Sequence, residues 1–338
     1  MKKEIQLKNI NKTFGSQVVL NKISLDIKQG EFFTLVGPSG VGKTTLLKII
    51  ANIEQANKGE LLFIPSVKEW SPCIMVFQDF MLFPHSTVLE NISYGLHSQD
   101  NYQRVFSTSS RKNHKKKILQ WVSQHLKDFG LEGLEKKYPA QLSAGQQQRV
   151  AIARAIIIQP ALLLLDEPFA NLDQNLKMET ALFLKNIQRK YQLTVIAVTH
   201  DLEEAFAMSD RIGVMLNSQI SQVGTPEAVY TKPLNQKVGS FLGSLNYLEF
   251  SEWSLCQFKG TSPDTKSKHV NILVRSEAIE LIQDKEGAGI ITKRTFLGFV
   301  IVFFVKINTK TIIVKQLSSS LNTNDRVSIL IKNYVVCE

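Results

Sequence analysis

A glycine-rich loop near the start of the chain constrains the fold more than any other feature. It matches the pattern G-x-x-x-x-G-K-[ST] at every fixed position and comprises Gly37, Pro38, Ser39, Gly40, Val41, Gly42, Lys43, Thr44 and Thr45. The apolar residues 32–36 before it predict a buried strand, and residues 45–51 after it predict a helix. Glycines let backbone amides turn inward around an anion, and the start of a helix adds positive potential. The loop therefore predicts an α/β unit that binds the phosphates of a nucleotide.

Two side chains of this loop have expected roles at the nucleotide. Lys43 is expected to reach the β- and γ-phosphates, and the Thr44 hydroxyl is expected to be a ligand of Mg²⁺. The alternative interpretation is a glycine turn that only links a strand to a helix. It is disfavoured because every fixed position is filled and both flanking segments fit.

An acidic pair follows a second apolar run. Residues 161–165 predict a strand that is buried on both faces, and the run ends at Asp166 and Glu167. A carboxylate at the end of such a strand can hold Mg²⁺, which fits Asp166, whereas Glu167 could polarise an attacking water. Acidic residues after a strand often only solvate a loop, but the phosphate-binding loop in the same chain favours the catalytic interpretation.

The segment Leu142-Ser143-Ala144-Gly145-Gln146 lies between these two motifs. This order of motifs resembles the nucleotide-binding subunit of ATP-binding cassette (ABC) transporters, whose signature is L-S-G-G-Q, with alanine at position 144 here. The resemblance implies ATP as the nucleotide. It also implies that Ser143, Gly145 and Gln146 bind ATP, with Ser143 and Gly145 at the γ-phosphate of a nucleotide held by the opposite subunit.

Four more residues match elements of that family in the expected order. The resemblance implies that Gln78 touches Mg²⁺ or its water and senses the membrane subunits, and that Asp173 lies in the loop that crosses the dimer interface. It implies that His200 contacts the γ-phosphate. Phe14 matches the aromatic ring that stacks on adenine, because any flat ring can stack. Taken singly, Gln78, Asp173 and His200 are each more often ordinary surface or core residues. For Phe14 the alternative is a core aromatic beside a turn glycine, and the adenine role is favoured.

Composition limits the other classes of protein. The three cysteines are far apart and have no metal-like spacing, which suggests a reducing compartment without a disulfide framework. We expect no signal peptide, and the longest apolar stretch, residues 296–305, is shorter than the roughly 20 residues that span a bilayer.

The net charge of +10 implies an anionic neighbour, which could be nucleic acid or a membrane surface. Its densest basic segment, residues 111–117, has no recognition-helix signature, so a solvated loop is favoured over lipid contact, and no nucleic-acid partner is expected.

The pattern along the chain predicts two domains. Residues 79–145 are expected to be mainly helical, between segments that contain strands, and residues 239–338 are expected to form a small all-β, OB-like domain. The resemblance implies that residues 1–238 form a P-loop ATPase core (an α/β fold) and that about 79–145 is a helical subdomain inserted into it. Residues 225–227 predict a helix that begins with proline. In the tail, residues 274–277 and 296–298 resemble the β-domain of bacterial importer ATPases, although such importers usually carry proline where this chain has Ser276. Residues 80–85 and 87–95 resemble the surface that receives a coupling helix from the permease, and packing inside the subdomain is the alternative.

The resemblance implies an ATPase subunit that powers import of a small solute or ion. Ferric iron or a polyamine is the best guess. Its implied partners are membrane permease subunits, a second copy of the chain in a homodimer and an extracytoplasmic substrate-binding protein. Its implied location is peripheral, on the cytoplasmic face of the bacterial inner membrane. The alternatives are a soluble ABC ATPase that acts on nucleic acid or ribosomes, and a regulatory binding module in which ATP turnover is secondary.

Overall fold

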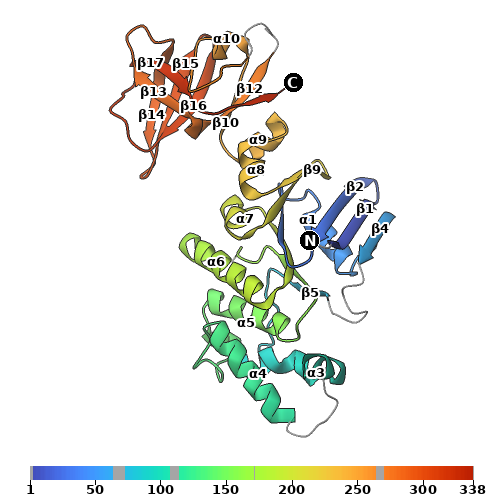
Figure 1. Ribbon diagram of the computed structural model, residues 1–338. Helices are drawn as coiled ribbons and strands as arrows, with labels where there is room; N and C mark the ends of the chain where they lie inside the picture. Colours follow the sequence, from blue (N-terminus) through green and yellow to red (C-terminus); the bar gives the residue numbers. More distant parts are fainter. Residues whose placement is uncertain (1–2, 64–72, 107–113, 171, 264–269, 338) are drawn as a thin grey trace. The chain divides into compact units, whose positions relative to one another are not determined.

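The computed structural model describes residues 3–63, 73–106, 114–170, 172–263 and 270–337 (Figure 1). They form two compact units, and the division falls after Pro226, at the start of helix α8 (Pro226–Thr231). The proline therefore begins a helix, as predicted. Most of α8 and all of α9 (Gln236–Leu242) belong to the second unit, whereas the predicted boundary after residue 238 falls within α9 and assigns α8 to the ATPase domain.

A buried arginine explains why α8 and α9 belong with the second unit. The Arg275 side chain donates to the carbonyl oxygens of Tyr230, at 2.9 and 3.0 Å, and of Gly239, at 2.7 Å. Its guanidinium also lies 4.1 Å from the centre of the Tyr230 ring. Because a buried arginine requires such partners, these contacts fix both helices to the strand that carries Arg275.

The first unit is built on a six-stranded sheet in which five strands are parallel and the edge strand β9 is antiparallel. The strand order is β5 (Cys73–Val76), β6 (Leu162–Asp166), β7 (Thr194–Thr199), β3 (Phe32–Val36), β8 (Arg211–Leu216) and β9 (Gln219–Gly224). Every residue of β3, β6 and β7 is buried, as continuous apolar runs predict for strands covered on both faces. Because these strands are parallel, the segments that follow them meet at one edge of the sheet.

A three-stranded antiparallel sheet packs over helix α1 (Lys43–Ile50) and the central sheet in one hydrophobic core (Figure 1). Its order is β2 (Gln17–Lys28), β1 (Lys3–Phe14) and β4 (Lys58–Phe63). Phe14 is the last residue of β1, so this sheet delivers the predicted adenine-stacking ring to its position.

The other core of the first unit joins the central sheet to a group of helices. Between α1 and α8 the described helices are α2 (Val88–Ser93), the 3-10 helix η1 (Tyr94–His97), α3 (Gln99–Phe106), α4 (His114–Asp128), the 3-10 helix η2 (Pro139–Gln141), α5 (Ala144–Ile156), α6 (Gln174–Tyr191) and α7 (Leu202–Met208). The stretch predicted to be helical, about 79–145, contains the first five of them. None of the helices in the described part of the chain combines the length and apolar character that a bilayer span requires.

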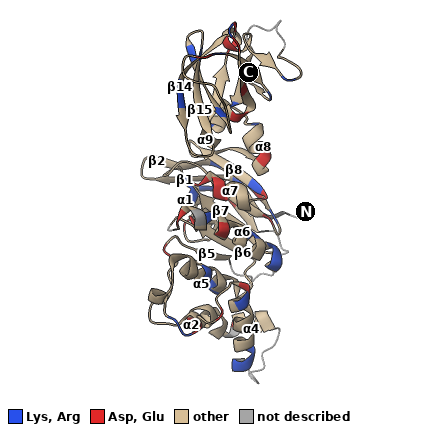
Figure 2. Cartoon of the chain, turned by 90° about the vertical axis from the view of Figure 1, so that its left-hand side faces the viewer, with Lys and Arg blue, Asp and Glu red and all other residues tan. Residues whose placement is uncertain are grey.

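The basic segment 111–117 lies partly outside the described residues, because the description resumes at His114. Figure 2 shows basic residues at the start of α4, and Lys115 and Lys116 are exposed there. These two side chains are therefore solvated, and residues 111–113 lie outside the described residues.

In its described residues, the second unit is an all-β domain with three short α-helices. One sheet has the order β10 (Leu245–Leu248), β12 (Asn271–Arg275) and β18 (Val335–Cys337). The other has the order β11 (Gln257–Phe258), β17 (Arg326–Ile331), β14 (Gly289–Phe296), β15 (Ile301–Ile307) and β16 (Lys310–Gln316), with β13 (Ile279–Gln283) paired to β17. The core includes Trp253, on α10 (Phe250–Trp253), and Phe303. Four short runs of β-branched and aromatic residues in the sequence predict strands of this domain, at 269–275, 299–305, 311–314 and 327–331. The last three overlap β15, β16 and β17, and the first overlaps β12, although His269 is outside the described residues.

Ser276 carries a buried hydroxyl without a partner among the described residues. The residue is fully buried, and its Oγ accepts and donates no hydrogen bond there. We expect Ser276→Ala to raise the free energy of unfolding of this unit by about 1 kcal/mol, because an unsatisfied buried polar group is removed. Denaturant unfolding measures the change, with the exposed Ser254→Ala as the control that should stay neutral. A destabilised Ser276→Ala protein would contradict the prediction.

Candidate nucleotide-binding site

The phosphate-binding loop joins β3 to α1 in a conformation that requires glycine. Gly40 and Gly42 have φ angles of +76° and +112°, and a Cβ atom on Gly42 would lie 2.5 Å from the Val19 carbonyl oxygen. The Lys43 ammonium donates to the carbonyl oxygens of Gly37, at 2.8 Å, and Pro38, at 3.0 Å. Burial lowers the pKa of Lys43, and the charges of Glu167 and Asp166 oppose that shift. The loop thus wraps around a cation that lies at its centre.

Thr44 and Asp166 meet directly, although they come from separate motifs. The Thr44 hydroxyl donates to Asp166 Oδ1 at 2.8 Å, because α1 and the end of β6 lie at the same edge of the sheet. Burial raises the pKa of Asp166, and the bond from Thr44 opposes the rise. Hydroxyl and carboxylate oxygens suit Mg²⁺, which usually takes few protein ligands and completes its shell with phosphates and water. The described residues contain no cluster of three or more His, Cys, Asp or Glu that could enclose a metal.

Glu167 and His200 form the second pair at this edge. His200 Nδ1 lies 2.9 Å from Glu167 Oε2, and the two residues follow the neighbouring strands β6 and β7. Glu167 has a positive φ of 46°, and its backbone amide donates to the Val198 carbonyl oxygen at 3.0 Å. A non-glycine residue in this region carries strain of the order of 1 kcal/mol, which the surrounding structure must offset. Asp166 accepts from Thr44 whereas Glu167 contacts His200, so the two carboxylates have different neighbours.

A pocket of about 300 Å³ lies at these residues. Eight predicted site residues and Val19 line it: Phe14, Val19, Ser39, Gly40, Gly42, Lys43, Thr44, Thr45 and Glu167. The Phe14 ring is 49% exposed, which leaves a face that a flat base could cover. Lys12 was not among the predicted site residues; its ammonium lies 4.8 Å from the centre of that ring and donates to Glu54 Oε1 at 2.6 Å. The sequence feature that could have identified Lys12 is its position two residues before Phe14.

The signature segment begins helix α5. Ser143 is the N-cap: its hydroxyl accepts from the Gln146 amide at 3.3 Å, and its own amide donates to Gln146 Oε1 at 3.1 Å. Ala144 is an exposed residue of the first turn without a positive φ, so alanine meets no backbone strain there. Gly145 is buried, and a Cβ atom on it would lie 3.1 Å from Leu176 Cδ2. The helix start therefore tolerates the methyl group that departs from the family signature.

Several predicted residues lie outside this pocket. They are Gly37, Pro38, Val41, Gln78, Ser143, Gly145, Gln146, Asp166, Asp173 and His200. Asp166 is connected to the pocket by the hydrogen bond from Thr44, and His200 is connected to it by the contact with Glu167. Gln78 is exposed after β5, and Asp173 is the exposed N-cap of α6. The structure of one chain does not bring Ser143, Gly145, Gln146 or Asp173 to the phosphate-binding loop.

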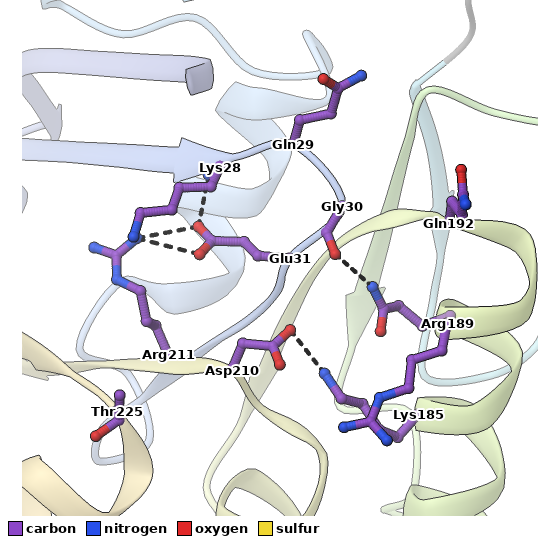
Figure 3. Close-up of a pocket in the computed structure, with 11 residues that line it drawn as sticks. Lys28, Gln29, Gly30, Glu31, Lys185, Arg189, Gln192, Asp210, Arg211 and Thr225 are labelled. Atoms are coloured by element: carbon purple, nitrogen blue, oxygen red, sulfur yellow. Dashed lines mark hydrogen bonds and ion pairs between the residues drawn. The ribbon is translucent and has the colours of Figure 1, made fainter. Parts of the chain in front are cut away.

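A larger cavity, of about 780 Å³, lies at the opposite edge of the central sheet, where β3, β7 and β8 begin (Figure 3). Both of its acids are paired: Glu31 with Arg211 at 3.1 Å, and Asp210 with Lys185 at 2.7 Å. These ion pairs hold the starts of β3 and β8 to each other and to α6. The cavity has no glycine loop and no pair of acids free for a metal, so the smaller pocket is the better candidate for a nucleotide.

Comparisons with known proteins agree with this geometry. The ABC transporter family matches residues 20–170. A spermidine/putrescine import ATP-binding protein PotA from Mesoplasma florum is 38% identical over 96% of this chain and 94% of that protein. The protein of the same name from Spiroplasma citri is 42% identical over 87% of this chain and 85% of that protein.

Solved structures of ABC transporter ATPases have a similar fold. CbiO1 from Clostridium perfringens, part of the transporter complex cbiONQ, has a TM-score of 0.57 and 28% identity over 68% of this chain and 91% of that chain. The dimeric bacterial ABC transporter cassette MJ0796 has a TM-score of 0.53 and 31% identity over 66% of this chain and 98% of that chain. With relatives that match nearly its whole length, the chain belongs to the ATP-binding subunits of ABC transporters, which are ATPases coupled to transport.

Proposed function

We propose that this chain hydrolyses Mg-ATP to power the import of a polyamine through a separate membrane permease. The relatives that match nearly the whole chain are named for spermidine and putrescine import, which supports the polyamine guess. They give no support to the ferric iron guess. The proposal places the chain at the cytoplasmic face of the membrane, together with an extracytoplasmic protein that delivers the substrate.

The main support for the proposal is that Thr44 contacts Asp166, and Glu167 contacts His200, at one edge of the sheet. Thr44 and Asp166 would hold Mg²⁺, which supplies charge neutralisation at the phosphates. When the nucleotide binds, the Lys43 ammonium would donate to phosphate oxygens in place of the loop carbonyl oxygens. Glu167 would orient and polarise the attacking water, and His200, whose Nδ1 faces Glu167, would present Nε2 to the γ-phosphate.

A second copy of the chain would complete the site. Ser143, Gly145, Gln146 and Asp173 do not line the pocket of their own chain, yet Ser143 and Gln146 lie at the exposed start of a helix, where an anion is favoured. In a head-to-tail dimer this helix start would close over the γ-phosphate of the partner. ATP would thus stabilise the dimer, and hydrolysis would release it.

An apolar groove beside Gln78 supports a permease contact. It has a volume of about 300 Å³ and includes Phe80, Met81, Phe83 and Tyr94. Met81 and Tyr94 are 58% and 61% exposed. Arg154 donates to the carbonyl oxygens of Met81 and Phe80, at 2.8 and 2.9 Å, and fixes this wall of the groove. Exposed apolar side chains of this kind favour a docked partner over packing within the subdomain alone.

Purification from membranes in mild detergent tests the permease and the substrate together. We expect the chain to co-purify with a permease and, in proteoliposomes supplied with the substrate-binding protein, to hydrolyse ATP faster with spermidine than with ferric ion. Tyr94→Ala should reduce permease recovery and stimulated turnover while ATP binding persists. The matched control is Ile53→Ala, which truncates an exposed apolar side chain outside the groove. Stimulation by ferric ion but not by spermidine would overturn the substrate proposal.

A further inference from the structure

A buried charge cluster connects the start of α6 with the segment that carries His200. The Lys177 ammonium lies 3.2 Å from Asp201 Oδ2 and 3.3 Å from Glu204 Oε1. The Glu204 side chain is only 4% exposed, and those of Lys177 and Asp201 are 16% and 17% exposed. Lys177 is on the first turn of α6, where its amide donates to the Asp173 carbonyl oxygen at 3.0 Å. The cluster therefore reaches the predicted interface loop at one end.

At its other end the cluster holds the residues on both sides of His200. The Thr199 hydroxyl donates to Glu204 Oε2 at 2.8 Å and accepts from the Asp201 amide at 3.0 Å. Asp201 Oδ1 also caps α7, where it accepts from the amides of Glu203, at 3.0 Å, and Glu204, at 3.3 Å. His200 itself is half exposed, and its ring contacts Glu167. Its backbone is fixed by its two neighbours.

The electrostatics make this cluster sensitive to the loss of either partner. Burial raises the pKa of Glu204, and the Thr199 hydroxyl and the Lys177 ammonium oppose that shift. Burial alone would lower the pKa of Lys177, but the Asp201 and Glu204 carboxylates outweigh it and raise the pKa. The Lys177 ammonium is thus stabilised by both carboxylates, and removing it leaves two acids close together in a largely buried site.

We propose that Lys177 and Glu204 are positioning residues for ATP hydrolysis, which couple the start of α6 at Asp173 to the placement of His200. This inference rests on the proposed function and adds residues that the sequence motifs did not include. The helices α6 and α7 lie side by side (Figure 1), and Lys177 is the link that reaches both Asp201 and Glu204. A shift of Asp173 at a dimer interface would then move the group that faces the γ-phosphate.

Kinetics of the full-length chain test the proposal. We expect Glu204→Gln to lower kcat by about 10-fold or more, because small misplacements of catalytic groups have effects of this size, with little change in KM for ATP. Glu203→Gln is the matched control, since it makes the same charge change at the adjacent exposed residue. Lys177→Met should behave like Glu204→Gln, the double variant should lose no more than either single one, and Lys177→Arg should retain most activity.

A second double-mutant cycle, between Glu204 and His200, distinguishes a positioning role from a general structural role. In a His200→Ala background, single-turnover assays with excess enzyme should show that Glu204→Gln has little further effect, because its influence passes through His200. An equal fold-loss with and without His200, or an unchanged kcat in Glu204→Gln, would overturn the proposal. If Glu204→Gln does not fold, Lys177→Met is compared with and without His200→Ala in its place, and the same outcomes test the proposal. If the wild-type chain hydrolyses ATP while Glu204→Gln is unaffected, only the positioning role fails; a wild-type chain without ATPase activity refutes the proposed function as well.

Discussion

Glu167→Gln is expected to slow ATP hydrolysis by about 100-fold or more while ATP binding persists. Glutamine keeps the shape of the side chain, so His200 retains a hydrogen-bonding neighbour at the position where it now lies 2.9 Å from the Glu167 carboxylate. The change removes only the carboxylate that would polarise water. Phosphate release measures turnover, and calorimetry with Mg-ATP measures binding.

The control for this variant is Glu132→Gln, which makes the same change at an exposed glutamate outside the pocket. It should hydrolyse ATP at the wild-type rate. Full turnover in Glu167→Gln would show that another group serves the water. Loss of ATP binding would show that Glu167 holds the nucleotide rather than the attacking water.

Lys43→Ala is expected to weaken Mg-ATP binding by about 100-fold or more, because charge-assisted hydrogen bonds to phosphate are among the strongest in proteins. The variant also removes the donor that the Gly37 and Pro38 carbonyl oxygens now share. Calorimetric titration measures the affinity, and circular dichroism checks that the chain remains folded. Lys58→Ala, at an exposed lysine of β4, should bind ATP normally. Wild-type affinity in Lys43→Ala would refute the assignment of the phosphate-binding loop.

Local patterns in the sequence were sufficient to predict the parts of the site that directly follow a strand. The apolar runs before Gly37 and Asp166 have the composition of strands covered on both faces, and the structure has β3 and β6 there. Once both strands lie in one parallel sheet, their ends must meet at one edge. The contact between Thr44 and Asp166 was therefore predictable as two ligands of one metal, although the two residues are 122 positions apart.

Contacts that depend on packing between distant elements were not predictable in this way. Lys177 and Asp201 are 24 positions apart, and the charge of either residue is ordinary for a helix surface until α6 and α7 are packed together. Arg275 likewise gave no sign that it would hold α8 and α9 to the second unit. Strand β14 was missed because its residues are mostly exposed and include two adjacent basic residues, Lys293 and Arg294, so its apolar alternation is weak.

The assembly state of Glu167→Gln with saturating Mg-ATP tests the central claim most directly, since the account requires two copies to complete each site. Size-exclusion chromatography with light scattering should find an ATP-dependent dimer, because unhydrolysed ATP keeps both half-sites closed. Adding Ser143→Arg should abolish the dimer by obstructing the facing γ-phosphate, whereas Ser254→Arg, at an exposed serine of the second unit, should leave it intact. A protein that stays monomeric with saturating ATP, or a dimer that Ser143→Arg leaves unchanged, would contradict the account.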